Sequence, residues 1–336
     1  DGPDSLGSAG YNTYVSKERA AELGIFNVTE DAETGKPHIF MKSEKTHEGP
    51  RESIRLEGKR RFNHGLFILD LSHMPAGCGV WPAFWMTDES NWPKNGEIDI
   101  VEGINRQPMV KTALHTSDQC SMYAHVPDWS WTGKWDTATG LPDTFTGELN
   151  FENRVEADNC WVMAPHQWAN QGCVAVDQRN NTLGAHLNEA GGGIYALEWD
   201  PANHFIRSWA FPREDGIPVN LQAVMDTASL EPSKRVTPDT DDWGVPYAYF
   251  AIGDAIGCSA DHFKDMRLVI NLAFCGTVAG NRFLRDCPEY AEFKMENEDD
   301  IGDPWKTCNA FIESNPKILE EAYWEIRGAY VFERSY

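Results

Sequence analysis

The sequence predicts an all-β fold, a sandwich or jelly roll built from short strands. Runs of aromatic and aliphatic residues recur along the chain and are separated by Gly, Pro, Asn and Asp, which is typical of strands joined by turns. Helical periodicity is scarce, and no long helices alternate with the strands. The 336 residues contain no internal repeat and no linker, so we expect a single domain over 1–336.

The individual elements follow from local patterns. Apolar and aromatic runs predict strands at 60–71, 268–274 and 328–332. The clearest hairpin joins 195–199 to 204–211 through the turn Asp200-Pro201-Ala202-Asn203. Short helices are expected at 16–23 and 316–324, the second with Pro near its start. Residues 127–159 and 217–243 lack a clear period, so we expect surface loops there.

Composition limits the partners of the chain. The net charge of -23 would repel phosphate backbones and anionic lipids, so neither nucleic acid nor a membrane is expected as a partner. No apolar run reaches the roughly 20 residues of a membrane-spanning helix. The first ten residues lack the basic and apolar regions of a signal peptide, so we expect any such peptide to be already removed. The 13 Trp suggest a surface that stacks flat ligands, although a large β core would use some of them.

The cysteines indicate an oxidising compartment. There are eight, with no CxxC spacing, so paired disulfides are favoured over a zinc site and a secreted protein is expected. Their pairing cannot be read from the sequence. Asn27 and Asn180 each begin a glycosylation sequon, which has meaning only in a secreted glycoprotein.

The candidate chemistry lies in Glu97-Ile98-Asp99-Ile100-Val101-Glu102, which follows the turn signal Asn95-Gly96. In a strand, Glu97 and Asp99 share one face, but strict alternation would turn Glu102 to the other. A one-residue bulge would restore it, leaving roughly 13 Å between the two glutamate Cα atoms. Inward-leaning side chains could then approach the separation of about 5 to 5.5 Å between carboxyls that retaining glycosidases use.

Three carboxylates in six residues repel one another, which raises at least one pKa, as a general acid requires. The alternatives are a solvated strand face or calcium ligands. The Asn-Gly turn, the apolar alternate positions and the preceding Trp81-Pro82-Ala83-Phe84-Trp85 favour a catalytic site over both. No phosphate loop, GxSxG elbow or HExxH helix supports another enzyme class.

Residues 95–103 resemble family 16 glycoside hydrolases, particularly fungal laminarinase-like endo-β-1,3(4)-glucanases. The resemblance includes Trp81-Pro82-Ala83-Phe84-Trp85 before this segment and Leu114-His115-Thr116-Ser117 after it. The resemblance extends over most of the chain. It implies a jelly roll of two curved antiparallel sheets whose concave cleft binds a neutral β-glucan. It also implies that Glu97 is the nucleophile, Glu102 the acid/base and Asp99 the residue between them.

We expect Asp99 to hydrogen-bond Glu97 and its charge to keep Glu102 protonated. His115 resembles the family's histidine near the acid/base, the alternative being a hydrogen-bonded core residue. Trp85 and Trp92 are the expected sugar platforms, because pyranose faces are apolar and stack on indole. Trp81 shares a strand face with Trp85 and could be a platform or a wall residue.

One departure concerns Val278, where the fungal relatives usually carry a Trp that stacks on the acceptor side. Residues 127–159 and 217–243 also look longer than in those relatives, which bears on specificity. The expected reaction is retaining endo-hydrolysis of β-1,3- or mixed β-1,3/1,4-glucan, with no cofactor and no metal, by a secreted monomer. The rivals are a transglycosylase on the same scaffold, a non-catalytic glucan-binding lectin, and family-16 activity on galactans or carrageenans, whose sulfated members the negative charge disfavours.

Overall fold

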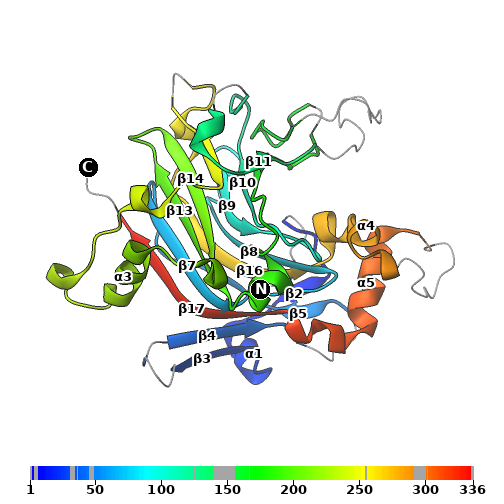
Figure 1. The fold of residues 1–336 in the computed structure, drawn as a ribbon. Helices are drawn as coiled ribbons and strands as arrows, with labels where there is room; N and C mark the ends of the chain where they lie inside the picture. Colours follow the sequence, from blue (N-terminus) through cyan, green and yellow to red (C-terminus); the bar gives the residue numbers. More distant parts are fainter. Residues whose placement is uncertain are drawn as a thin grey trace.

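Two seven-stranded antiparallel sheets stacked face to face form the computed structural model (Figure 1). It describes residues 2–3, 7–30, 35, 37–44, 49–123, 126–138, 156–165, 167–253, 256–290, 300 and 302–333. The first sheet has the order β11-β12-β10-β9-β8-β16-β6, the second β15-β14-β13-β7-β17-β4-β3, and a small third sheet β1-β2-β5. The all-β prediction is confirmed.

The strands of the described chain are β1 Gly2–Pro3, β2 Asn12–Tyr14, β3 Phe26–Glu30, β4 Pro37–Lys42, β5 Arg51–Ser53, β6 Arg55–Glu57, β7 Gly65–His73, β8 Val80–Thr87, β9 Glu97–Glu102, β10 Lys111–His115, β11 Lys134–Trp135, β12 Cys173–Val176, β13 Gly193–Asp200, β14 Phe205–Pro212, β15 Ala248–Ala251, β16 Arg267–Phe274 and β17 Tyr323–Phe332. The α-helices are α1 Lys17–Glu22, α2 Gly184–Glu189, α3 Val219–Thr227, α4 Phe283–Asp286 and α5 Pro304–Ser314. Short 3₁₀ segments are η1 Asp128–Ser130, η2 Arg213–Asp215, η3 Pro232–Lys234, η4 Thr240–Trp243, η5 Ala260–His262, η7 Pro288–Tyr290 and η9 Pro316–Glu321, and η6 Gly276–Gly280 is a π turn.

Most predicted strands are present. The hairpin at 195–211 is β13 and β14, paired in continuous antiparallel register, and the runs at 268–274 and 328–332 belong to β16 and β17. The strand predicted at 60–71 begins only at Gly65. Before it, Phe62 forms an isolated bridge with Met266 and the backbone bends at residues 63–64, which separates 60–62 from β7.

The helices follow the sequence less closely. The predicted helix at 16–23 is α1, whose N-cap Ser16 accepts a hydrogen bond from the Arg19 N–H. The helix predicted at 316–324 is wrong beyond Glu321: only a 3₁₀ segment forms, because Tyr323 and Trp324 join β17 and pair with β4, which buries Trp324 completely. Within 217–243, where only loop was expected, the structure contains α3.

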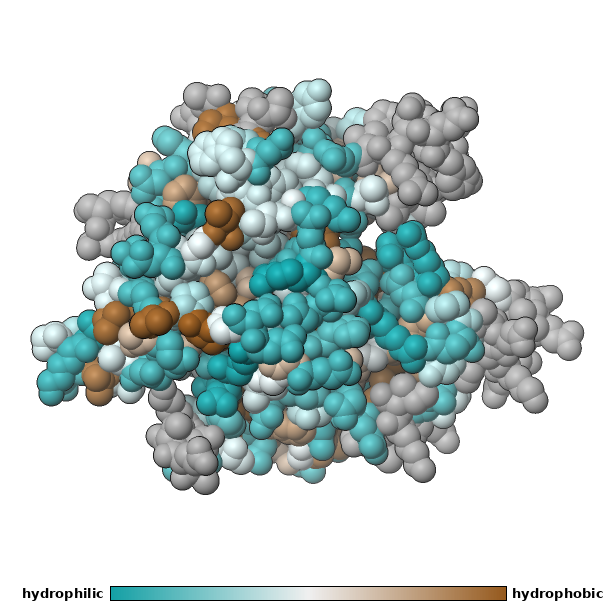
Figure 2. Space-filling model, viewed as in Figure 1, coloured by the Kyte–Doolittle hydropathy of each residue, from teal (hydrophilic) through white to brown (hydrophobic). Residues whose placement is uncertain are grey.

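The main core lies between the two large sheets. On β7, Phe67 and Leu69 point into it, as Ile98 and Ile100 do from β9. The alternate residues of β7, with Trp209 of β14, form a second core on the outer face of their sheet, which α3 covers. Both faces of β7 are therefore buried. Figure 2 shows a largely hydrophilic surface on the side viewed.

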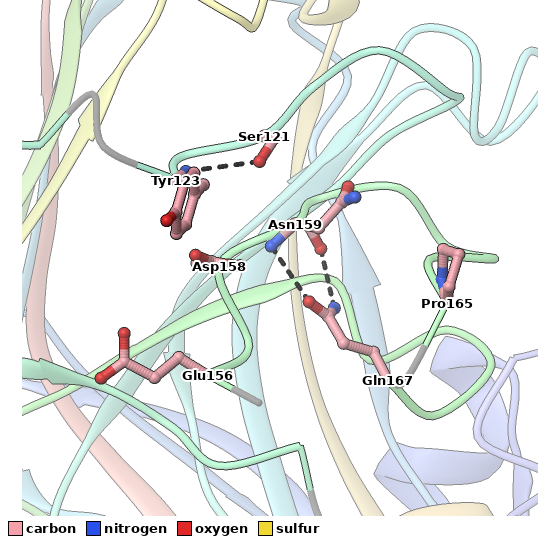
Figure 3. A pocket seen from close by; sticks show the side chains of 7 residues that line it. All are labelled: Ser121, Tyr123, Glu156, Asp158, Asn159, Pro165 and Gln167. Carbon is pink, nitrogen blue, oxygen red and sulfur yellow. Dashed lines mark hydrogen bonds between the residues drawn. The ribbon is translucent and has the colours of Figure 1, made fainter. Parts of the chain in front are cut away.

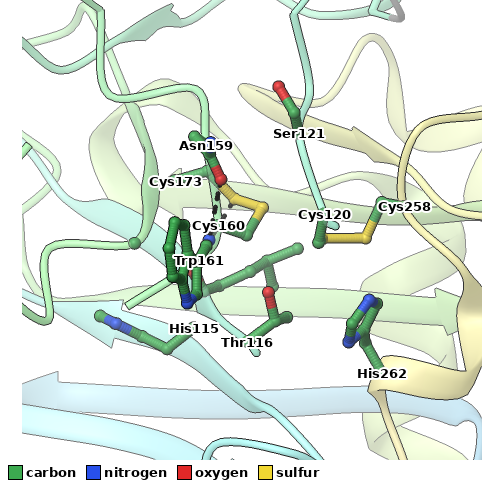
Figure 4. Close-up of a disulfide and its surroundings, with 12 residues drawn as sticks. His115, Thr116, Cys120, Ser121, Asn159, Cys160, Trp161, Cys173, Cys258 and His262 are labelled. Atoms are coloured by element: carbon green, nitrogen blue, oxygen red, sulfur yellow. Dashed lines mark hydrogen bonds between the residues drawn. A yellow bond between two sulfur atoms is a disulfide. The ribbon is translucent and has the colours of Figure 1, made fainter. Parts of the chain in front are cut away.

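Four disulfides join all eight cysteines, which confirms the predicted pairing: Cys78–Cys287, Cys120–Cys258, Cys160–Cys173 and Cys275–Cys308. Two of them attach the region of α4 and α5 to the ends of β8 and β16. Of the other two, Cys120–Cys258 joins the segment after β10 to the segment after β15, and Cys160–Cys173 joins the segment before β12 to its first residue (Figure 4). Within the described part of the chain, no helix is long and apolar enough to cross a membrane.

Candidate active site

The strand β9 carries the three predicted carboxylates and lies between β8 and β10. It begins after Gly96, whose φ of 75° belongs to the left-handed region that favours glycine. A Cβ at this position would also lie 2.4 Å from the carbonyl oxygen of His262. Glycine is therefore required both by the turn and by the close approach of the neighbouring loop.

A bulge interrupts β9 between its acidic residues. Asp99 pairs with Trp85 on β8 and Ala113 on β10, whereas Glu102 pairs with Ala83 and Lys111. Three steps along β9 thus correspond to two along each neighbour, which is one extra residue. The predicted bulge is confirmed, and it returns Glu102 to the face that Glu97 and Asp99 occupy.

Glu97, Asp99 and His115 form the first half of the site. His115 lies on β10 directly opposite Glu97, and one oxygen or nitrogen atom from each of the three side chains lies within 4.8 Å of the other two. His115 Nε2 is 2.8 Å from Asp99 Oδ2. The bond expected from Asp99 to Glu97 is thus replaced by one to His115, because the histidine reaches across from the adjacent strand. Such a group could also ligate a metal ion, but the ion pair accounts for its geometry.

The electrostatics of this half are dominated by burial. Burial and the Asp99 charge raise the pKa of Glu97, while His115 and a hydrogen bond from Trp92 oppose the increase. Burial alone would lower the pKa of His115, but the Asp99 bond and the three carboxylates outweigh it and raise that pKa to about 9. His115 is therefore cationic near neutral pH and offsets one of the buried negative charges.

Glu102 forms the second half of the site with other partners. Its Oε1 accepts a 2.9 Å hydrogen bond from Trp81 Nε1, and Lys111 lies opposite it on β10. Burial and Asp99 raise the pKa of Glu102, whereas His115, Trp81 and Lys111 lower it. With both glutamate pKa values raised, the pair can hold one proton near neutral pH, which an acid and a nucleophile working together require.

The predicted tryptophans occupy three different environments. Trp81 is only 8% exposed and borders Glu102 as a wall residue. Trp92 is 40% exposed and bonds Glu97, so it combines a free surface with a contact to the carboxylate. Trp85 donates to Asn271 Oδ1 at 2.7 Å, and the Arg55 guanidinium lies 4.9 Å from the centre of its ring. The Arg55 guanidinium therefore covers one face of the Trp85 indole.

The segment that contains Asn159, Trp161 and Gln167 lies beside the end of β10 that carries His115. Thr116 bridges with Trp161, which Figure 4 shows near His115. Gln167 fixes this segment, since its side-chain amide accepts from the Asn159 N–H at 3.0 Å and donates to the Asn159 carbonyl at 2.8 Å. Figure 3 shows these two hydrogen bonds at the edge of a cavity of about 350 Å³, which Tyr123 also lines.

Sequence reasoning missed Lys111, Asn271 and Trp161. The position of Lys111 was readable, because it alternates with Ala113 and His115 on one face of β10. Asn271 and Trp161 come from segments remote in sequence from β9, and only the sheet order and the disulfide-linked loop bring them to the site.

Comparison with known proteins identifies the family of the chain. Residues 2–332 match the family model of the XgeA-like catalytic GH16 domain. The chain belongs to glycoside hydrolase family 16. The family resemblance noted in the sequence is thereby confirmed.

Named relatives and solved structures point the same way. A probable endo-1,3(4)-β-glucanase of Aspergillus fumigatus is 34% identical over 99% of this chain and 42% of its own length. An endo-1,3(4)-β-glucanase of Arthroderma benhamiae is 34% identical over 96% of this chain and 59% of its own. The family-16 chain therefore spans about half the length of these relatives.

Laminarinase 16A of Phanerochaete chrysosporium, solved with 6-O-glucosyl-laminaritriose in donor and acceptor sites, superposes with a TM-score of 0.74 at 28% identity, over 98% of this chain and 93% of that one. An elongating family-16 β-1,3-glucosyltransferase superposes with a TM-score of 0.73 at 29% identity, over 97% of this chain and 92% of that one. The jelly-roll prediction is thus confirmed.

Proposed function

We propose that this family-16 domain is a retaining endo-β-1,3(4)-glucanase, with Glu97 as nucleophile and Glu102 as acid/base. The observation that carries the proposal is the bulge in β9, which sets both glutamates and Asp99 on one face. Family membership and relatives named as endo-1,3(4)-β-glucanases support the same reaction and a neutral β-glucan as substrate.

The reaction proceeds in two displacements. The ionised Glu97 carboxylate attacks the anomeric carbon while Glu102 gives its proton to the departing glycosidic oxygen. Glu102 then removes a proton from water, which attacks the glycosyl–Glu97 ester and releases a product with the original anomeric configuration. Asp99 holds His115 in its cationic form, and Trp92 steadies Glu97 through its hydrogen bond.

A transferase would share the first displacement and use a sugar hydroxyl instead of water in the second. The similarity to an elongating β-1,3-glucosyltransferase gives this alternative a specific basis. Hydrolysis is the better supported proposal, because the relatives named above are glucanases.

We also propose that the chain acts as a single catalytic domain, as a monomer and outside the cell. The four disulfides and the fungal relatives are consistent with secretion. Asn27 and Asn180 are exposed, as glycosylation of a secreted protein would require.

The test is product analysis by mass spectrometry and NMR after incubation with laminarin, lichenan and a β-1,4-glucan. We expect oligosaccharides from the first two, β-anomers appearing first, and no product from Glu97→Ser. Products longer than the starting oligosaccharide would indicate transfer. Binding without cleavage would instead make the protein a lectin.

A further inference from the structure

The loop between β8 and β9, residues 88–96, carries Trp92 and leads directly into Glu97. Its first residue, Asp88, is only 4% exposed although it is an acidic residue. A carboxylate is rarely buried unless other groups satisfy it, so its partners indicate what it does. The reaction described above makes no use of Asp88.

In the described part of the chain, four groups donate to this carboxylate, and three of them belong to the loop itself. Oδ1 accepts from the backbone N–H of Ser90 at 3.2 Å and from Arg61 Nη1 at 3.3 Å. Oδ2 accepts from the side-chain amides of Asn91 and Asn95, both at 2.8 Å. The carboxylate therefore bonds residues on both sides of Trp92.

Other hydrogen bonds close the base of the loop. Thr87 Oγ1 donates to the Gly96 carbonyl at 3.0 Å. The N–H of Ser117, which follows β10, donates to the Pro93 carbonyl at 3.1 Å. These bonds do not involve the aspartate, so we expect β9 to keep its place when the carboxylate is altered and the change to be confined to the loop.

The indole of Trp92 is the group through which the loop acts on the reaction. Burial raises the pKa of Glu97, and the hydrogen bond from Trp92 opposes this increase. The indole is 40% exposed, so the packing of neighbouring side chains holds it only in part. Its position therefore depends on the backbone of the loop, which the Asp88 carboxylate organises.

Asp88 is ionised wherever the proposed reaction takes place. Burial alone would raise its pKa, but the hydrogen bonds from the two asparagines and the Ser90 N–H, together with the charge of Arg61, outweigh burial and lower that pKa. The bonds that organise the loop are therefore present throughout the working pH range, and a titration seen in the activity does not arise from Asp88 itself.

We propose that Asp88 is a positioning residue of the reaction, which holds the loop 88–96 so that the Trp92 indole donates to the Glu97 carboxylate. The inference rests on the proposed function, in which Glu97 is the nucleophile. Asp88 acts through Trp92, and the experiments below separate this action from a general contribution to stability.

The first experiment measures the pH profile of kcat/KM on laminarin for Asp88→Asn. In this variant an NH₂ group replaces one oxygen and meets hydrogen-bond donors in either orientation. We expect the acid limb to move to higher pH by about 0.5 to 1 pH unit, because Glu97 loses part of the bond from Trp92. A direct effect of the removed charge would have the opposite sign, since it would lower the pKa of Glu97. A shift to lower pH, or no shift, would overturn the proposal.

Two comparisons exclude a merely structural role. When Trp92→Phe is already present, Asp88→Asn should move the acid limb no further, and an additional shift would contradict the proposal. The matched control is Asp200→Asn, because Asp200 is fully buried in the turn between β13 and β14 and accepts from the backbone and side-chain amides of Asn203. It should lower the melting temperature by a few degrees and leave the acid limb in place. A shift of the limb in this control as well would show that lost stability alone causes it.

The indole N–H resonance of Trp92 distinguishes failure of this inference from failure of the proposed function. It is identified by its absence from the NMR spectrum of Trp92→Phe. In the wild type it should respond to pH as Glu97 ionises, and in Glu97→Gln it should not. A response reduced by at least half in Asp88→Asn supports the inference even if the wild type cleaves nothing. An undiminished response in Asp88→Asn, or none in the wild type, would contradict it even if the wild type is an active glucanase.

Discussion

Glu97 and Glu102 lie at the two ends of β9 and differ in their hydrogen-bond partners, although both feel the charges of Asp99 and His115. At the Glu97 end, Trp92 and the ion pair of Asp99 with His115 surround a carboxylate close to a cross-strand cation. At the Glu102 end, the contacts are an indole N–H and the more distant charge of Lys111. The hydrogen-bond partners of the two glutamates therefore differ, although burial and Asp99 raise the pKa of both.

The largest effect expected from this difference is in chemical rescue. Glu97→Ala should reduce turnover of laminarin on the order of 10⁴-fold or more, because the nucleophile is removed. Glu102→Ala should lose about 10²- to 10⁴-fold on laminarin, the usual contribution of a general acid, yet still form the glycosyl–enzyme from an activated aryl laminaribioside.

Added azide identifies which residue is which. It should yield the α-glycosyl azide with Glu97→Ala, by direct displacement, and the β-glycosyl azide with Glu102→Ala, after the second displacement. NMR of the products reads the configuration. The opposite pattern would exchange the two roles.

A smaller effect is expected when the shared charge is removed. Asp99 raises the pKa of both glutamates, so Asp99→Asn should lower both and move the alkaline limb of the kcat/KM profile to lower pH. Activity at the optimum should fall about 10²-fold, because His115 also loses its partner. His115→Gln removes a positive charge and should move the same limb to higher pH. A profile unchanged in both variants would contradict the coupling.

The two indole hydrogen bonds allow a sharper comparison. Trp92→Phe should raise the pKa of Glu97 alone and move the acid limb to higher pH, because the nucleophile must be ionised. Trp81→Phe should raise the pKa of Glu102 alone and move the alkaline limb to higher pH. Losses at the optimum should be only a few-fold. Shifts of the same limb in both variants would show that the pair does not divide its roles in this way.

The smallest expected effect is on stability. A carboxyl whose pKa is raised in the folded state stabilises the protein fully below the unfolded value of 4.5, and this stabilisation is lost as the pH rises through the raised pKa. Glu97→Gln or Glu102→Gln should therefore raise the melting temperature by a few degrees at pH 8 and by less at pH 4. Differential scanning calorimetry measures this, with the exposed Glu231→Gln as control. An equal increase at both pH values would exclude the ionisation as its cause.

The sequence predicted what depends on local pattern. The alternation in β9, the turn at Asn95-Gly96 and even the bulge could be derived from six residues, because a strand has only two faces. The hydrogen bond between Asp99 and His115 could not be predicted, since it depends on the register between β9 and β10. The helix α5 was not predicted, although Asp303 caps it and Pro304 begins it. The contacts of Trp85 with Asn271 and Arg55 required the order of β8, β16 and β6.

The face on which Glu102 lies depends on the number of residues between it and Glu97 and on the bulge in β9 that absorbs one of them. Deleting Ile100 would change none of these acidic residues and would remove the bulge, but it would leave four residue steps between the two glutamates, so strict alternation alone would keep Glu102 on the face of Glu97 and Asp99. Deleting Val101 as well would leave three steps and turn the Glu102 carboxylate toward the core between the sheets. A library of single and double deletions in this strand should therefore retain the shared face after the first deletion and lose activity at the second by inversion of a face, a failure that no substitution scan could reveal.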